Sequence, residues 1–158
     1  MKILFRTFII CVCITFLACG KEELKQTVPW APVFFKVNLN NLDTELTALG
    51  GYKTFTKARL ADEQVGFSGL LIVRNLINES DGTPILLAYD LCCPNDRMKE
   101  VRVSPQANGK AKCNKCGSVF NLYSGGNPES GPSESGLQRY QAIPERPYNG
   151  IFRISRQN

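Results

Sequence analysis

The sequence predicts an all-β fold, an antiparallel sandwich or partial barrel, on three observations. Short apolar runs recur along the chain, and several alternate between apolar and polar residues, as half-buried strands do. Clusters of glycine, proline, asparagine and serine separate these runs. No segment carries the long periodic pattern of an amphipathic helix. The chain has 158 residues, which is enough for one ordinary domain with its own core.

The first expected elements lie between residues 33 and 50. Residues 33–39, Val-Phe-Phe-Lys-Val-Asn-Leu, combine high β-propensity with partial alternation, which predicts a strand. Leu42, Leu46 and Leu49 have the spacing of one helical face, and Gly50 follows them as a stop signal. We therefore expect one or two helical turns after the first strand.

The rest of the chain predicts a hairpin followed by short strands. Residues 69–74 and 85–90 are apolar runs, and the turn-rich segment 78–84 between them predicts a β-hairpin. Residues 124–136 have almost no apolar content, and a loop of this length within a domain is often functional. Further short strands are expected at residues 101–103, 111–113, 119–122, 140–143 and 151–154.

Residues 1–18 are typical of a secretory signal peptide. Lys2 and Arg6 precede the uncharged apolar stretch 8–18, which is shorter than the ~20 residues of a bilayer span. The stretch ends in Phe-Leu-Ala-Cys-Gly at residues 16–20, which resembles a lipobox, although phenylalanine replaces the more usual leucine. We expect Cys19 to be lipidated and to become the new N-terminus. An uncleaved membrane anchor is the alternative.

A lipid on Cys19 would make residues 19–29 a polar tether and residues 30–158 the β domain. The tether begins with Lys21-Glu22-Glu23, which resembles a surface-export signal of some Gram-negative outer-membrane lipoproteins, and a solvated linker is the alternative. The sequence has no twin-arginine pair, so we expect export as an unfolded chain. The expected location is the outer membrane, on its periplasmic or outer side.

The absence of histidine excludes several kinds of site. Because the sequence contains no histidine, it can form no Ser-His-Asp triad, no Cys-His pair and no imidazole-ligated zinc site. No other nucleophile–base pair stands out, so an enzyme is not expected. The net charge of +5 is modest, and a nucleic-acid partner is not expected either.

Four cysteines remain in the β domain, because Cys11 and Cys13 leave with the signal peptide. Cys92-Cys93-Pro94 ends one expected strand, and Cys113-Asn114-Lys115-Cys116-Gly117 lies between two others. A Cys-x-x-Cys-Gly turn points both thiolates to one side, since glycine permits the tight backbone. Converging loops could hold zinc or iron through four ligands. The fourth ligand stays open, because adjacent cysteines project in different directions.

Two alternatives need no metal. Disulfides persist outside the cytosol, and a Cys93–Cys113 or Cys93–Cys116 bridge would join the two loops. A thioredoxin-like pair would need a helix after Cys116, where strand-like residues follow instead. The loops are also basic, which would favour thiolates and could steer an acidic partner; a solvated edge is the alternative. Between residues 97 and 115 the sequence has one acidic residue, Glu100, and six basic ones: Arg97, Lys99, Arg102, Lys110, Lys112 and Lys115.

From Cys113 onward, the order of motifs resembles the Rieske family. Rieske domains carry Cys-x-His in one loop and Cys-x-x-His in a later one, followed by Gly-Ser-x-Phe, a glycine-rich turn, a Gly-Pro loop and a Leu-x-x-Tyr strand. The resemblance covers about residues 30–156, mostly through their second half. This chain has Cys113-Asn114-Lys115-Cys116-Gly117-Ser118-Val119-Phe120, Gly125-Gly126, Gly131-Pro132 and Leu137-Gln138-Arg139-Tyr140.

The resemblance implies a Rieske-like fold, a [2Fe-2S] cluster and electron transfer. It implies that Cys93 and Cys113 are the two cysteine ligands. It also implies that the Ser118 hydroxyl lies near the cluster sulfur and that Gly131-Pro132 belongs to the covering loop.

The chain departs from the family where the histidines belong. Cys116 stands at one histidine position and Asn95 at the other. Cys92 could supply the remaining ligand, and otherwise nothing stronger than Asn95 or Asp96 is at hand. Two imidazoles raise the potential of a Rieske centre, so a thiolate set implies a lower one. A chain exported unfolded could not carry a cluster inserted beforehand. Zinc or a disulfide, with a structural or binding role and an unknown protein partner, is therefore the alternative.

Overall fold

Burial alternates along the first strand, β1 (Val33–Asn38), as the sequence predicts. Phe35 and Val37 are buried, whereas Phe34 and Lys36 face solvent. The structure is a computed structural model, and it describes residues 26–156. The predicted signal peptide, the lipidated Cys19 and most of the tether lie outside the described residues. Within the described part of the chain, no helix is long and apolar enough to cross a membrane.

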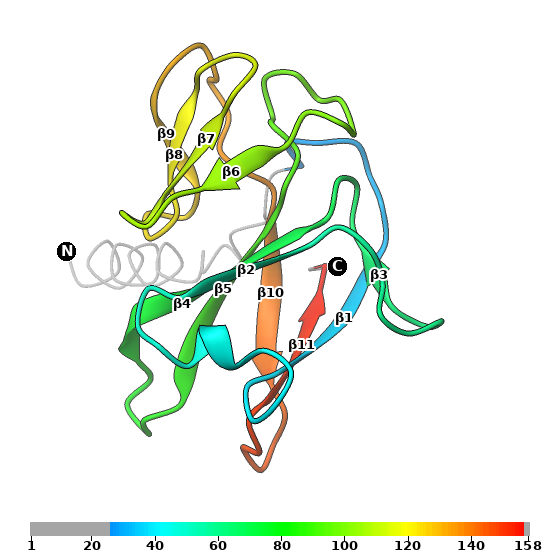
Figure 1. Cartoon of the computed structure of the whole chain (residues 1–158), viewed down its shortest axis with the longest axis vertical. Coiled ribbons are helices and arrows are strands. Elements are labelled where there is room, and N and C mark those ends of the chain that lie inside the picture. The colour runs from blue at the N-terminus through cyan, green and yellow to red at the C-terminus, as the bar shows by residue number, and fades with distance from the viewer. Residues whose placement is uncertain (1–25, 157–158) are drawn as a thin grey trace, which may run out of the picture.

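A seven-stranded antiparallel sheet forms the larger part of the fold (Figure 1). Its two longest strands form the predicted hairpin, with Leu71 opposite Tyr89 and Arg74 opposite Leu86. The sheet curves into a partial barrel, so the predicted all-β fold class is confirmed. Its strands lie in the order β2 (Tyr52–Phe55), β4 (Leu70–Asn78), β5 (Pro84–Asp90), β10 (Arg139–Pro144), β11 (Ile151–Ser155), β1 and β3 (Gln64–Val65).

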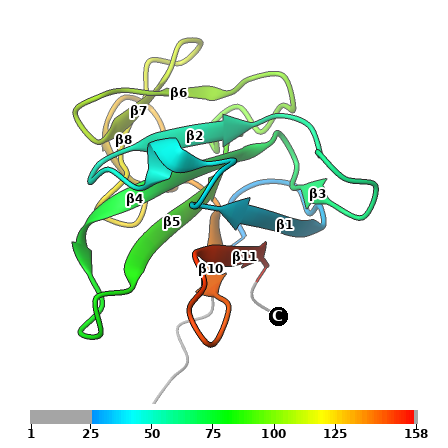
Figure 2. The ribbon, with the colours of Figure 1, turned by 60° about the horizontal axis from the view of Figure 1, so that its bottom comes forward.

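A smaller antiparallel sheet lies at one end of the molecule (Figures 1 and 2). The chain enters it after β5 and leaves it before β10, so the small sheet is an insertion between two paired strands of the large one. Its strands are β6 (Val103–Pro105), β7 (Lys110–Cys113), β8 (Val119–Asn121) and β9 (Asn127–Ser130), in that order.

Each sheet has its own apolar core. One core fills the inside of the large sheet around Phe35, Ile72 and Phe152. The other packs the small sheet against the opposite side of β4 and β5, and it contains Cys93 and Cys113. This explains why β4 is a continuous apolar run rather than an alternating one, since both of its faces are buried.

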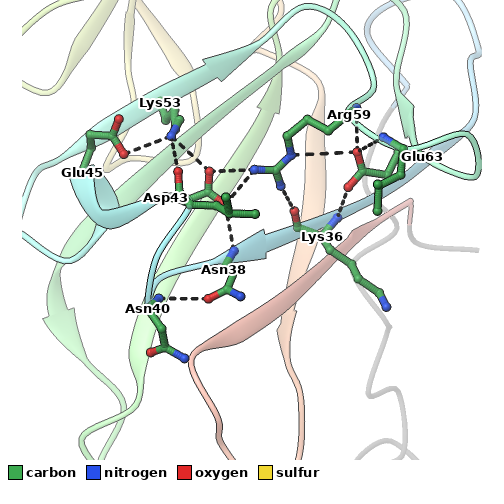
Figure 3. A network of polar contacts seen from close by, with 10 residues as sticks. Lys36, Asn38, Asn40, Asp43, Glu45, Lys53, Arg59 and Glu63 are labelled. Atoms are coloured by element: carbon green, nitrogen blue, oxygen red, sulfur yellow. Dashed lines mark hydrogen bonds and ion pairs between the residues drawn. The ribbon is translucent and has the colours of Figure 1, made fainter.

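A polar network holds the long segment between β1 and β4 (Figure 3). Asp43 is fully buried and accepts hydrogen bonds from the Asn38 amide at 2.8 Å and the Arg59 guanidinium at 3.0 Å. The Lys53 ammonium forms a second ion pair with Asp43, with its Nζ 3.2 Å from the Asp43 Oδ1. Glu63 accepts the Arg59 amide at 2.8 Å. Because every charge in this network has a partner, we assign it a structural role.

Some elements differ from the sequence prediction. The expected helical turns shorten to one 3₁₀ turn, η1 (Thr44–Leu46), where Leu46 is buried while Leu42 and Leu49 are about 60% exposed. Their spacing therefore does not mark one buried face. The strands β2, β3 and β9 were not predicted, and β9 lies within the segment 124–136 that was predicted to be a loop.

Candidate metal centre

The loop between β5 and β6 makes a tight turn at Cys93. The Cys93 amide donates to the Val101 carbonyl at 3.0 Å, which ties the turn to the returning chain. The Arg97 amide donates back to the Cys93 carbonyl at 2.8 Å. Arg97 has a φ of 53°, and among the described residues it is the single non-glycine residue with a positive φ. Such a conformation is costly for a non-glycine residue, so the surrounding turn must impose it.

The loop between β7 and β8 makes the same turn at Cys113. The Cys113 amide donates to the Ser118 carbonyl and the Gly117 amide donates back to the Cys113 carbonyl, both at 2.9 Å. Gly117 has a φ of 80°. In both loops the fourth residue after the cysteine has positive φ and closes the turn. Each turn therefore presents the side chain of its first residue and of the residue three positions later.

Four donor atoms converge between the two turns. The Sγ atoms of Cys93, Cys113 and Cys116 and a carboxylate oxygen of Asp96 all lie within 4.8 Å of one another. The Cys93 and Cys116 sulfurs are 3.6 Å apart, and the Cys113 sulfur is 3.7 Å from the Asp96 Oδ2. Cys93 and Cys113 are buried, whereas Asp96 and Cys116 are partly exposed. This group can hold a metal ion.

The surroundings of the group favour ionised ligands on its exposed side. The Lys115 ammonium lies 2.9 Å from the Asp96 Oδ1 and, chiefly through this hydrogen bond, lowers the pKa of the Asp96 carboxyl. Partial burial raises the pKa of the Cys116 thiol, but hydrogen bonds to Ser118 and to the neighbouring thiols outweigh it and leave that pKa lowered. Burial raises the pKa of Cys93, so a bound cation would have to displace its proton.

Ser118 links the second turn to the loop after β9. Its hydroxyl lies 3.2 Å from the Cys116 sulfur and accepts a hydrogen bond from the Ser133 amide at 3.0 Å. Gly131 lies directly against the Ser118 backbone, because a Cβ at Gly131 would come within 2.5 Å of the Ser118 Cα. The segment with Gly131 and Pro132 therefore packs against Ser118 at the edge of the group.

Replacing Gly131 with alanine is expected to destabilise this part of the fold. The new Cβ would overlap backbone atoms of Ser118, and Gly131 also has a φ of 90°. Overpacking and the positive φ together should lower the free energy of unfolding by about 2–4 kcal/mol. Gly82→Ala is the matched control, since Gly82 has a φ of 82° and nothing within 4 Å of the added Cβ. Equal losses in urea unfolding would contradict the close packing.

Cys92 is not brought into the group. Its amide donates to the buried Asp90 Oδ1 at 2.8 Å, and its sulfur lies 3.5 Å from the carbonyl oxygens of Cys93 and Met98. Adjacent side chains in an extended segment point in opposite directions, so Cys92 turns away when Cys93 faces the other cysteines. Burial raises the pKa of the Cys92 thiol to about 11. Cys92 was one candidate for the fourth ligand, and the structure brings Asp96 into the group instead of Cys92.

The disulfide alternatives are not formed. Cys92, Cys93, Cys113 and Cys116 are all free thiols. The Cys93–Cys116 separation of 3.6 Å is a contact between unbonded sulfurs, since a disulfide bond is about 2.05 Å long. The two loops are therefore held by the shared apolar core and by hydrogen bonds rather than by a covalent bridge.

The donor set could be only partly predicted from the sequence. Cys93, Cys113 and Cys116 were expected to converge, and Asp96 was one of several residues considered for the last position. Cys93-x-x-Asp96 repeats the spacing of Cys113-x-x-Cys116, and this shared spacing is the signal that would have selected Asp96. Cys19 lies outside the described residues.

Comparison of the sequence with known proteins identifies no related family or curated protein. The sequence matches no protein-family model and none of the curated proteins. The resemblance to the Rieske family therefore stays a prediction that depends on the order of motifs.

Proposed function

We propose that this chain is a lipid-anchored protein of the Gram-negative outer membrane whose Rieske-like β domain holds a single zinc ion. Cys93, Asp96, Cys113 and Cys116 would be its ligands. The ion would have a structural role: it would join the turn after β5 to the turn after β7 and so fix a basic surface for a protein partner.

The observation that carries this proposal is the pair of matching turns. Each turn supplies donors at its first and fourth positions, and all four atoms lie within 4.8 Å of one another. A Zn–S bond of about 2.3 Å gives a tetrahedron with edges of about 3.8 Å between sulfurs. The 3.6 Å between the Cys93 and Cys116 sulfurs is close to such an edge, and the Cys113 sulfur and the Asp96 Oδ2 are similarly near, at 3.7 Å. Thiolates and a carboxylate are also ligands that zinc accepts.

Electron transfer by a [2Fe-2S] cluster is the second candidate, and the motif order favours it. The hydrogen bond between Ser118 and Cys116 agrees with the role that the resemblance implies for that serine. A two-iron cluster, however, spreads its ligands over two metal ions. Ligands on different irons stand farther apart than ligands of one ion, so the compact donor group fits a single ion better.

Cobalt substitution tests the ligand set. Tetrahedral Co²⁺ bound through three thiolates and an oxygen has visible bands and a thiolate charge-transfer band. Added zinc should displace the cobalt and abolish these bands. Asp96→Cys should shift the visible bands to longer wavelength, because a fourth thiolate replaces the carboxylate. An unchanged spectrum in that variant would contradict ligation through position 96.

Asp96→Asn should weaken zinc binding while leaving the fold intact. The amide is a poorer ligand than a carboxylate, so the loss should be at least the roughly 10–100-fold that removal of a supporting group costs. Competition with a chromogenic chelator measures the affinity. Glu100→Gln is the matched control, since Glu100 is an exposed carboxylate of the same loop outside the donor group. Equal affinities in the two variants would exclude Asp96 as a ligand.

A further inference from the structure

On the outer side of β1, β10 and β11, exposed or partly exposed side chains alternate with the buried ones that face the core. The strand register aligns two rows of side chains on this face. Phe34 is 38% exposed and stands in one row with Ser155 and Gln141. Ile143 is 44% exposed and stands in the other row with Lys36 and Arg153, which are both exposed. We call this surface the outer β1 face; its side chains are Phe34, Lys36, Gln141, Ile143, Arg153 and Ser155.

Trp30 precedes this face and is 65% exposed, the highest value among the large apolar side chains of the described chain. The Arg156 guanidinium lies 6.0 Å from the Trp30 ring centroid and 5.7 Å from that of Tyr140. Trp30 is therefore held beside the end of β11 although nothing buries its ring. An exposed tryptophan beside a cationic side chain is a combination that favours the interface between a membrane and water.

The chain enters the fold close to this tryptophan. The Thr27 amide donates to the Gln138 Oε1 at 2.9 Å, and Val28 is fully buried. This contact fixes the entering chain at the start of β10. Six residues lie between Cys19 and Gln26, and so short a segment spans at most about 25 Å from Cys19 to Gln26. A lipid on Cys19 would thus keep this end of the domain close to the bilayer.

We propose that the outer β1 face, together with Trp30, lies on the surface of an anionic phospholipid membrane. This inference rests on the lipid anchor of the proposed function. Trp30 and Phe34 would enter the headgroup region, and Lys36 and Arg153 would pair with lipid phosphates.

Trp30 is the single tryptophan of the sequence, so its fluorescence reports this orientation directly. The lipidated full chain would be reconstituted into vesicles of phosphatidylethanolamine and phosphatidylglycerol. Trp30 emission should shift to shorter wavelength, and brominated phospholipid should quench it. Lys36→Gln and Arg153→Gln should each lower the ratio of quenched to unquenched protein about fivefold at low salt. Lys112→Gln, on the small sheet, is the matched control and should leave the ratio unchanged.

The outcomes separate the two proposals. Protein that floats with the vesicles while Trp30 stays unquenched would overturn the membrane-facing role of the outer β1 face and leave the anchor standing. Protein that does not float would overturn the anchor, and the inference with it. A blue shift that depends on protein concentration without vesicles would assign the face to contact between copies of the chain, and would also overturn the inference.

Discussion

Cys113→Ala is expected to abolish zinc binding and to lower the melting temperature more than any other single cysteine replacement. Cys113 is fully buried and lies within reach of Cys93, Cys116 and Asp96. A ligand that binds only the folded state adds about 4 kcal/mol when its free concentration is a thousandfold above Kd. Losing that contribution should lower the Tm by roughly 10–20 °C. Thermal unfolding in a zinc buffer measures it.

Cys92→Ala is the matched control for Cys113→Ala. Both residues are buried cysteines with free thiols, but the Cys92 sulfur lies outside the donor group. Its removal should cost only the small cavity it leaves, about 1 kcal/mol, and zinc binding should persist. A chelator should lower the Tm of Cys92→Ala and of the unchanged protein equally, and should have no effect on Cys113→Ala. Equal Tm losses in the two variants would contradict a site that links the loops.

Asp90→Ala is expected to have the second large effect, because one buried carboxylate satisfies four donors. Its Oδ1 accepts from the Ser68 amide at 3.1 Å and the Cys92 amide at 2.8 Å. Its Oδ2 accepts from the Phe67 amide at 2.7 Å and the Tyr140 hydroxyl at 2.8 Å. Alanine would leave all four donors unpaired, three of them buried, so the free energy of unfolding should fall by about 3–5 kcal/mol.

Tyr140→Phe serves as the control for Asp90→Ala, since it removes one of the four donors and keeps the ring. Its expected loss is about 1 kcal/mol. The loss of unfolding free energy in Asp90→Asn should lie between those of the other two variants. Its amide oxygen can still accept two hydrogen bonds, but its amide nitrogen faces the Phe67 donor. Urea unfolding gives all three values. If Asp90→Ala were no more damaging than Tyr140→Phe, Asp90 would not organise this loop.

The strands that the sequence predicts are those whose burial follows a simple pattern. β1 alternates, and β4 and β5 are apolar runs around a turn. β1 and β5 appear close to their expected bounds, whereas β4 extends to Asn78, four residues beyond its expected end. The strand β9 could not be predicted, because Asn127–Ser130 has no apolar alternation and contains a proline. It forms because β8 offers an open edge, and the resulting pair has an irregular register. Tertiary context decides such strands.

The cysteine site shows the same limit. Residue types and spacing identified Cys113 and Cys116, but the adjacent Cys92 and Cys93 left the choice between them open. That choice depends on the backbone: Asp90 fixes the Cys92 amide, and the turn closed by Arg97 directs Cys93 and Asp96 toward the second loop. The positive φ of Arg97 has no signature in the sequence, since glycine is the residue expected at such a position.

The metal content and absorption spectrum of the protein, purified without oxygen or chelator, test the central claim most directly. We predict a colourless protein with one equivalent of zinc and no visible absorption. A brown protein with equal amounts of iron and acid-labile sulfide would contradict the zinc centre and support the [2Fe-2S] alternative. A colourless, metal-free protein without free thiols would contradict both metal centres.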